Sequence, residues 1–161
     1  MKVCCFTGHR TLPSGVAVRL AHALDRHLAA LYDAGVREFR TGGALGFDTL
    51  AALRVLALRE RHPDCRLVLY LPCRGQSDAW REGERALYAD ILAKADEAHF
   101  LHERYTPTCM QERNRAMVDG SDVCIAYLAR STGGTKQTFL YALRQGLEVI
   151  NLAEELSQKN L

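Results

Sequence analysis

Three segments of the sequence combine glycine with hydroxyl side chains, a composition typical of loops that bind phosphate. They are Thr7-Gly8-His9-Arg10, Thr41-Gly42-Gly43-Ala44-Leu45-Gly46-Phe47-Asp48 and Ser131-Thr132-Gly133-Gly134-Thr135. Glycine lets backbone N–H groups approach a ligand closely, and the N-terminus of a following helix adds unpaired donors and partial positive charge. For one such loop alone, a tight turn explains the glycines equally well. Three together, with the cation of Arg10, predict an anion-binding site.

Common motifs for phosphate and for zinc are absent. The sequence contains neither GxGxxG nor GxxxxGK[ST], so we expect neither a standard dinucleotide fingerprint nor a P-loop. The six cysteines form no CxxC pair, and there is no HExxH segment, so no metal site is expected. The cysteines are expected to be reduced thiols, mostly in the core, and no cofactor is expected.

Short apolar runs alternate with segments of helical period along the whole chain. We expect strands at 2–7, 36–41, 66–71, 97–102, 122–128 and 147–152. We expect helices at 15–34, 79–95, 109–118, 135–145 and 153–159, and one more that ends near Arg61. All four prolines (Pro13, Pro63, Pro72 and Pro107) fall in the loops of this pattern.

This alternation predicts an α/β protein with a single Rossmann-like, doubly wound domain over residues 1–161. The strands that are apolar on both faces require a mostly parallel sheet with helices on both sides. A length of 161 residues with 48% hydrophobic content suits one such domain. Ligands of doubly wound sheets bind beyond the carboxyl ends of the strands. The three glycine segments each follow a strand, so we expect them to meet at that edge.

Composition excludes several classes of protein. The formal net charge is only +2, which is too balanced for a protein that coats nucleic acid. No stretch approaches the roughly 20 consecutive apolar residues that cross a bilayer, and the N-terminus turns polar before a signal-peptide core forms. We therefore expect a cytoplasmic protein without a membrane partner.

Four stretches of the sequence together resemble a known family. They are a TGHR first loop, the segment TGGALGFDTLAA, an LPC segment with Gln76 and Trp80 nearby, and a late GGT-x-x-T. This combination resembles the YpsA-like branch of the SLOG superfamily, whose members are Rossmann-like domains that bind nucleotides or nucleotide-derived ligands. The segment from Gly42 to Asp48 is also similar to the SG-x-A-x-G-[IF]-D segment of DprA, which lies on that protein's nucleotide-like pocket.

The resemblance to LOG phosphoribohydrolases separates binding from chemistry. Those enzymes carry Arg-Lys-x-x-Met, then an Asp before a strand, then Pro-Gly-Gly-x-Gly-Thr-x-x-Glu, whose Arg and Glu are the hydrolytic residues. Here residues 112–117 and Asp122 resemble the first part, and Arg113 takes the place of the family's Arg. The position of the Glu is occupied by Thr138 or Leu140, depending on the alignment. The resemblance therefore implies a retained pocket without an evident catalytic carboxylate.

Three functions follow, and the sequence leaves them open. The first is binding of a nucleotide or nucleotide-derived ligand, phosphoribosyl or ADP-ribose-like, as a sensor or carrier. The alternative is a LOG-like nucleoside-monophosphate phosphoribohydrolase that uses Arg113 with a carboxylate from elsewhere, such as Asp48, Glu112 or Asp119. A second alternative is DprA-like binding of single-stranded nucleic acid, against which the balanced charge and the 7% aromatic content argue. Relatives of the LOG type assemble through their helices, so homo-oligomers are also expected, without a defined stoichiometry.

The candidate ligand-binding residues come from the three loops and the segment around Arg113. They are Thr7, Gly8, His9, Arg10, Gly42, Gly43, Ala44, Gly46, Asp48, Arg113, Asn114, Gly133, Gly134, Thr135 and Thr138. For Asp48, the alternatives are a hydrogen bond to a ribose hydroxyl and capping of its own helix. For His9, they are ligand contact and a purely structural role.

Overall fold

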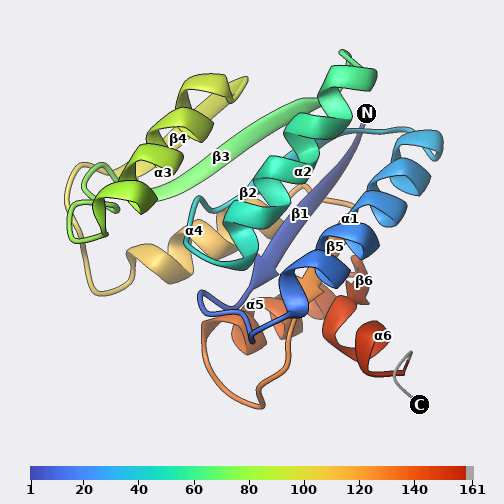
Figure 1. Ribbon diagram of the computed structural model, residues 1–161. Helices are drawn as coiled ribbons and strands as arrows, with labels where there is room; N and C mark the ends of the chain where they lie inside the picture. Colours follow the sequence, from blue (N-terminus) through green and yellow to red (C-terminus); the bar gives the residue numbers. More distant parts are fainter. Residues whose placement is uncertain (159–161) are drawn as a thin grey trace.

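The computed structural model describes residues 1–158 and forms a six-stranded sheet with helices on both faces (Figure 1). The strands are β1 (Lys2–Gly8), β2 (Val36–Thr41), β3 (Arg66–Cys73), β4 (Glu97–His102), β5 (Val123–Tyr127) and β6 (Glu148–Asn151). The helices are α1 (Val16–Asp33), α2 (Phe47–Arg61), α3 (Glu82–Lys94), α4 (Cys109–Val118), α5 (Gly134–Arg144) and α6 (Leu152–Gln158). The expected helix at 153–159 thus begins one residue early, and Lys159 lies outside the described residues.

The sheet has the order β4-β3-β2-β1-β5-β6, and every pairing is parallel. The chain builds outward from β1 through β4 on one side, then returns to build β5 and β6 on the other. The topological switch therefore lies between β1 and β5, where Thr7 pairs with Ala126 and Gly8 with Tyr127. This arrangement confirms the predicted Rossmann-like class and places a crevice for ligands beyond the carboxyl ends of these two strands.

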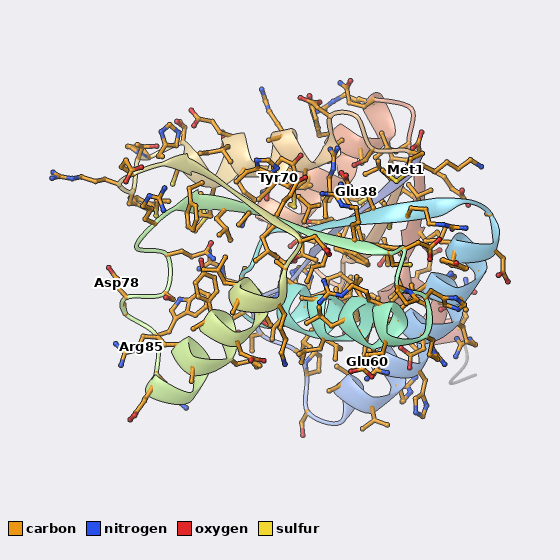
Figure 2. All side chains as sticks on the ribbon, turned by 90° about the horizontal axis from the view of Figure 1, so that it is seen from above. Met1, Glu38, Glu60, Tyr70, Asp78 and Arg85 are labelled. Carbon is orange, nitrogen blue, oxygen red and sulfur yellow. The ribbon has the colours of Figure 1, made fainter. Side chains whose placement is uncertain are left out.

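Apolar faces explain the two helical layers. The larger core lies under α1, α2 and α6, where Leu20, Leu24 and Leu28 of α1 are fully buried against the sheet. The smaller core lies under α4 and α5 and includes Met117 and Ala142. Figure 2 shows the sheet between the layers, with Glu60 of α2 and Arg85 of α3 on one side and α4 and α5 on the other.

The cysteines and the helices bear on two of the predictions made from the sequence. All six cysteines are free and buried, as predicted for reduced core thiols. Within residues 1–158, each helix is too short or too polar to cross a membrane.

Two predictions near β3 were wrong. Pro72 lies inside β3 instead of in a loop. A proline is tolerated there because the ladder between β2 and β3 ends at Leu69, so its missing N–H removes no bond to β2. The third helix begins at Glu82 and not at residue 79, because Glu84 accepts a hydrogen bond from the Arg81 backbone N–H (3.0 Å) and fixes the start of α3.

Candidate functional site

A cavity of about 290 Å³ opens at the topological switch, beyond the carboxyl end of β1. Its walls come from the β1–α1 loop, the β2–α2 loop, α4 and the β5–α5 loop. The residues that line it are Phe6, Thr7, Gly8, His9, Arg10, Thr11, Ala44, Asp48, Met110, Arg113, Asn114, Met117, Arg130, Thr132, Gly133, Gly134 and Thr135. The fold thus brings all three glycine segments to one place.

Most of the candidate residues line this cavity, but four do not. Gly42, Gly43 and Gly46 lie behind its wall, and Thr138 faces a neighbouring groove between α4 and α5. The hydroxyl of Thr138 donates to the carbonyl of Gly134 (2.9 Å), so it braces the first turn of α5.

Glycines of the first two loops are required by the packing of the fold. A Cβ on Gly8 would collide with the ring of Phe47, and a Cβ on Gly46 would lie 2.6 Å from the carbonyl oxygen of His9. Gly46 also has a φ of 76°, which side-chain-bearing residues rarely adopt. The Phe47 N–H donates to the His9 carbonyl (3.1 Å) and joins the two loops. These glycines therefore hold the walls together.

Glycines of the third loop differ, because nothing in the fold occupies the space beside them. A Cβ on Gly133 or on Gly134 would meet no atom within 4 Å, and Gly134 has no positive φ. Gly134 is the first residue of α5, whose N-terminus has no side-chain cap and no acidic residue in its first turn. The first N–H groups of a helix have no intrahelical partners. The N-terminus of α5 therefore presents free donors to the cavity.

The charges that line the cavity are mainly positive. Arg10, Arg113 and Arg130 contribute three cations, and Asp48 contributes the one carboxylate. Arg10 and Arg130 lie in exposed parts of the loops, whereas Arg113 is only 5% exposed. Together with the dipole of α5, this excess of positive charge favours an anionic ligand.

Asp48 and Arg113 both line the cavity, and both side chains lie against Gly42. A Cβ on Gly42 would lie 2.7 Å from Cζ of Arg113 and 2.9 Å from Oδ2 of Asp48, so only glycine fits between them. Arg113 donates to the Gly42 carbonyl and, through Nε, to the Asn114 side chain (2.8 Å). Asp48 accepts from the Ala44 N–H (3.4 Å), so it braces its loop and does not cap α2.

Burial changes the acidity of both groups. It raises the pKa of Asp48 to about 6, although the charge of Arg113 and the N–H groups of the loop act in the opposite direction. Burial likewise lowers the pKa of Arg113, and Asp48 partly counteracts this. A carboxyl that titrates near neutral pH inside a cavity is typical of functional sites.

His9 joins two loops. Its Nε2 accepts a hydrogen bond from the Ala129 N–H (2.9 Å), and its ring packs edge-on against Tyr127. This bond requires a neutral ring, and burial followed by the charge of Arg130 lowers the pKa of His9. His9 lines the cavity, but its Nε2 already accepts the hydrogen bond from the Ala129 backbone N–H.

Sequence reasoning missed several lining residues. Arg130 directly precedes the third glycine segment, so the charge next to Ser131 was a usable signal. Met110 and Met117 lie one turn before and after Arg113 on α4, at a spacing that shares one helix face. Phe6 and Thr11 were not expected either, and Thr132 belongs to the third glycine segment but was not among the candidate residues.

Comparison with known families shows to which family the chain belongs. The YpsA model, described as the YspA SLOG family, matches residues 14–151. The chain belongs to the YpsA family of SLOG proteins. It is 30% identical to the SPbeta prophage-derived protein YoqJ of Bacillus subtilis over 73% of this chain and 78% of that one. It is 28% identical to a UPF0398 protein of Bacillus velezensis over 78% of this chain and 74% of that one.

The fold of this YpsA-family protein also matches a solved structure. DNA processing protein A of Helicobacter pylori, solved to study its single-stranded DNA binding mode, aligns with a TM-score of 0.66 and 20% identity. The alignment covers 99% of this chain and 73% of that one. At this identity the match shows a shared fold.

Proposed function

We propose that this YpsA-family protein binds a nucleotide or a nucleotide-derived ligand, phosphoribosyl or ADP-ribose-like, as a sensor or carrier. The ligand's phosphate lies against the N-terminus of α5, and its sugar lies toward Asp48 on the floor of the cavity. The SLOG family and the position of the cavity at the topological switch support this proposal.

The observation that carries the proposal is the open N-terminus of α5. Gly134 has room for a side chain, so the fold itself does not demand glycine there. Because Gly134 has no side chain, the N–H groups of the first turn of α5 are accessible from the cavity. Arg10 and Arg130 lie beside them, so both the dipole and two side chains attract a phosphate.

The test replaces Gly134 by glutamate. The side chain fits the free space, and a carboxylate in the first turn of a helix stabilises it by about 0.3–1 kcal/mol. The fold is therefore retained while the carboxylate fills and neutralises the phosphate site. Gly83→Glu is the matched control, because Gly83 is also in a first turn, that of α3, with open space beside it and no part in the cavity.

Binding is measured by isothermal titration calorimetry and thermal shift with AMP, ADP, ATP, NAD and ADP-ribose. We expect at least one of them to stabilise the wild-type chain and the Gly83→Glu variant, by about 2.7 kcal/mol at 100 times its dissociation constant. The Gly134→Glu variant loses this stabilisation. Failure of every nucleotide to bind the wild type, or equal binding by Gly134→Glu, contradicts the proposal.

A second candidate function is hydrolysis of a nucleoside monophosphate, and the position of Asp48 favours it. Glu112 accepts hydrogen bonds from His102 and Thr108, and Asp119 accepts one from Tyr141, so both lie outside the cavity. Asp48 alone of the three lines it, beside Arg113. A carboxyl with a pKa of about 6 can exchange a proton near neutral pH.

In that reaction the bond between C1′ of the ribose and the base nitrogen breaks, and a water oxygen bonds to C1′. One proton of the water passes to the leaving base, and Asp48 either relays it or stabilises the positive charge that develops on the sugar. Chromatography of AMP incubated with the protein detects free adenine. Adenine release that the Asp48→Asn substitution abolishes supports hydrolysis. Binding of AMP that leaves the AMP intact supports the role of sensor or carrier.

A further inference from the structure

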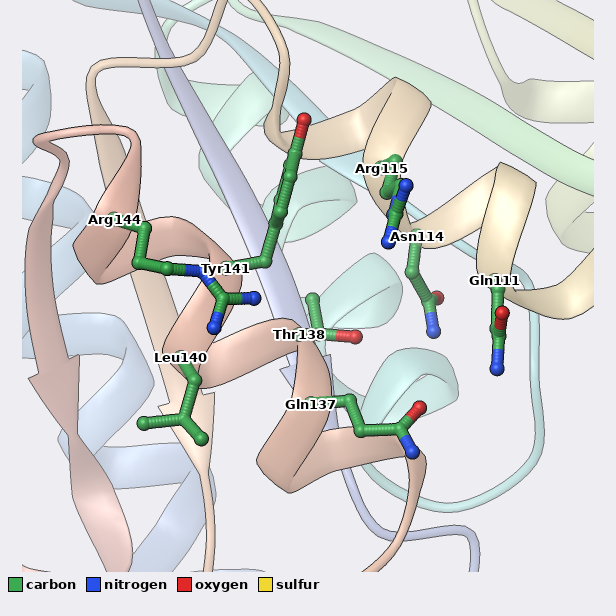
Figure 3. A pocket seen from close by; sticks show the side chains of 8 residues that line it. All are labelled: Gln111, Asn114, Arg115, Gln137, Thr138, Leu140, Tyr141 and Arg144. Carbon is green, nitrogen blue, oxygen red and sulfur yellow. The ribbon is translucent and has the colours of Figure 1, made fainter.

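A second cavity, of about 310 Å³, lies between α4 and α5 (Figure 3). Its lining consists of Gln111, Asn114 and Arg115 from α4 and Gln137, Thr138, Leu140, Tyr141 and Arg144 from α5. We refer to it as the α4–α5 groove. Figure 3 shows Gln137 extending from α5 toward α4, from which Asn114 and Gln111 project into the same space.

The α4–α5 groove continues the cavity at the switch point. Asn114 lines both, and α5 runs from Gly134 in the first cavity to Gln137 and Tyr141 in the groove. The seven steps along the helix from Gly134 to Tyr141 span about 10 Å. Each cavity alone is at the small end of the range of ligand sites, about 300–1,000 Å³, whereas the two together form one site of ordinary size.

The polar groups of the groove offer both donors and acceptors. Gln111, Asn114 and Gln137 are primary amides, each with a carbonyl oxygen and an NH₂ group. No hydrogen bond inside the described chain engages the side chains of Gln111 and Gln137, and Asn114 uses only its oxygen, for Arg113. Amide side chains match the paired donor and acceptor atoms on the edge of a nucleobase.

One wall of the groove is a fixed aromatic ring. The hydroxyl of Tyr141 donates to Asp119 (2.7 Å), and the guanidinium of Arg115 lies 5.3 Å from the ring centre. Leu140, an exposed apolar residue, lies beside it. The eight lining residues include two arginines and no carboxylate. The groove therefore suits a planar, hydrogen-bonding ring that belongs to an anionic molecule.

We propose that the α4–α5 groove holds the base of the ligand whose phosphate lies at the N-terminus of α5. This inference rests on the proposed function and adds the direction in which the ligand extends. The ligand runs from Gly134 along α5 toward Tyr141, and the amides of Gln111 and Gln137 contact the edge of its base. Base preference is then a property of these amides and independent of phosphate binding.

The test compares AMP by calorimetry with ribose 5-phosphate, which carries a hydroxyl group at C1′ in place of the base. The variants are Gln137→Ala and the double variant Gln111→Ala/Gln137→Ala, in which exposed glutamines are shortened on helix surfaces. Gln145→Ala is the matched control, an exposed glutamine at the end of α5 outside the groove.

We expect the double variant to bind AMP about ten-fold more weakly, since each hydrogen bond contributes roughly two- to twelve-fold in affinity. Its affinity for ribose 5-phosphate stays within two-fold of the wild-type value, and Gln145→Ala changes neither. Unchanged AMP affinity in the double variant overturns the groove assignment while leaving phosphate binding intact. An equal loss for both probes also overturns it. If neither probe binds the wild type, this inference fails, and the proposed function fails with it only if ADP, ATP, NAD and ADP-ribose do not bind either.

Discussion

Replacing Asp48 by asparagine is expected to stabilise the protein, increasingly so as the pH rises. Asparagine has nearly the same shape and keeps an oxygen that accepts the Ala44 N–H bond. Arg113 keeps its bonds to the Gly42 carbonyl and to Asn114. The substitution removes the free-energy cost of burying a charged carboxylate. Carboxylates that serve a function often carry such a cost.

The magnitude follows from the pKa of Asp48, which rises from an ordinary 3.8 to about 6 on folding. Between these values the folded state binds more protons than the unfolded state, so stability falls as the pH rises. Well above pH 6 the full cost is about 3 kcal/mol. Between pH 5 and pH 8 alone, the free energy of unfolding of the wild type falls by roughly half of this cost through this group.

Urea denaturation at pH 5, 6, 7 and 8 measures this effect as the difference between Asp48→Asn and the wild type. His9 titrates in both proteins, so its contribution cancels. Asp90→Asn, on the exposed surface of α3, is the control and shows no such trend. A stability difference that is constant or shrinks between pH 5 and pH 8 would mean that folding does not raise the pKa of Asp48.

Three further predictions concern the walls of the cavity and its ligand. Gly42→Ala should destabilise the chain by about 1–3 kcal/mol in urea denaturation because its Cβ has no room beside Arg113, whereas Gly134→Ala should not destabilise it. Burial lowers the pKa of His9, so its stabilising contribution is present above about pH 6.5 and lost as the pH falls. The stability advantage of the wild type over His9→Gln in thermal unfolding should therefore shrink from pH 8 to pH 5, because Asp48 is present in both proteins and its contribution cancels in the difference. A 20-nucleotide oligo-dT should give no salt-dependent fluorescence anisotropy change, and an affinity that falls steeply with salt would instead support the DprA-like alternative.

The sequence predicts the fold well because each element has its own local pattern. The leucines of α1 recur on one face, and β5 is apolar on both faces, so neither depends on distant contacts for its assignment. The loop before α3 does depend on a distant contact. Residues 74–81 form a loop in which the side chain of Gln76 donates to the Gly43 carbonyl (3.0 Å), a contact between segments far apart in sequence.

The position of the candidate site could be predicted from the sequence, but the roles of its residues could not. Parallel strands bring their carboxyl ends to one edge, so the loops after β1, β2 and β5 had to lie on that edge, and the strand order β2-β1-β5 makes them neighbours. Which glycines face a ligand depends on what fills the space beside each one. Phe47 lies beneath Gly8 and Arg113 beside Gly42, while the space beside Gly134 is open. The α4–α5 groove arises from packing of two helices whose contact no local pattern encodes.

The most direct test of nucleotide binding is an NMR titration of the ¹⁵N-labelled chain with AMP. We expect the largest chemical-shift changes at the backbone amides of Gly133, Gly134 and Thr135, because the phosphate accepts hydrogen bonds from the first turn of α5. Absence of shifts at millimolar AMP and, in parallel titrations, ADP, ATP, NAD and ADP-ribose, or shifts confined to residues outside the two cavities, contradicts nucleotide binding at this site.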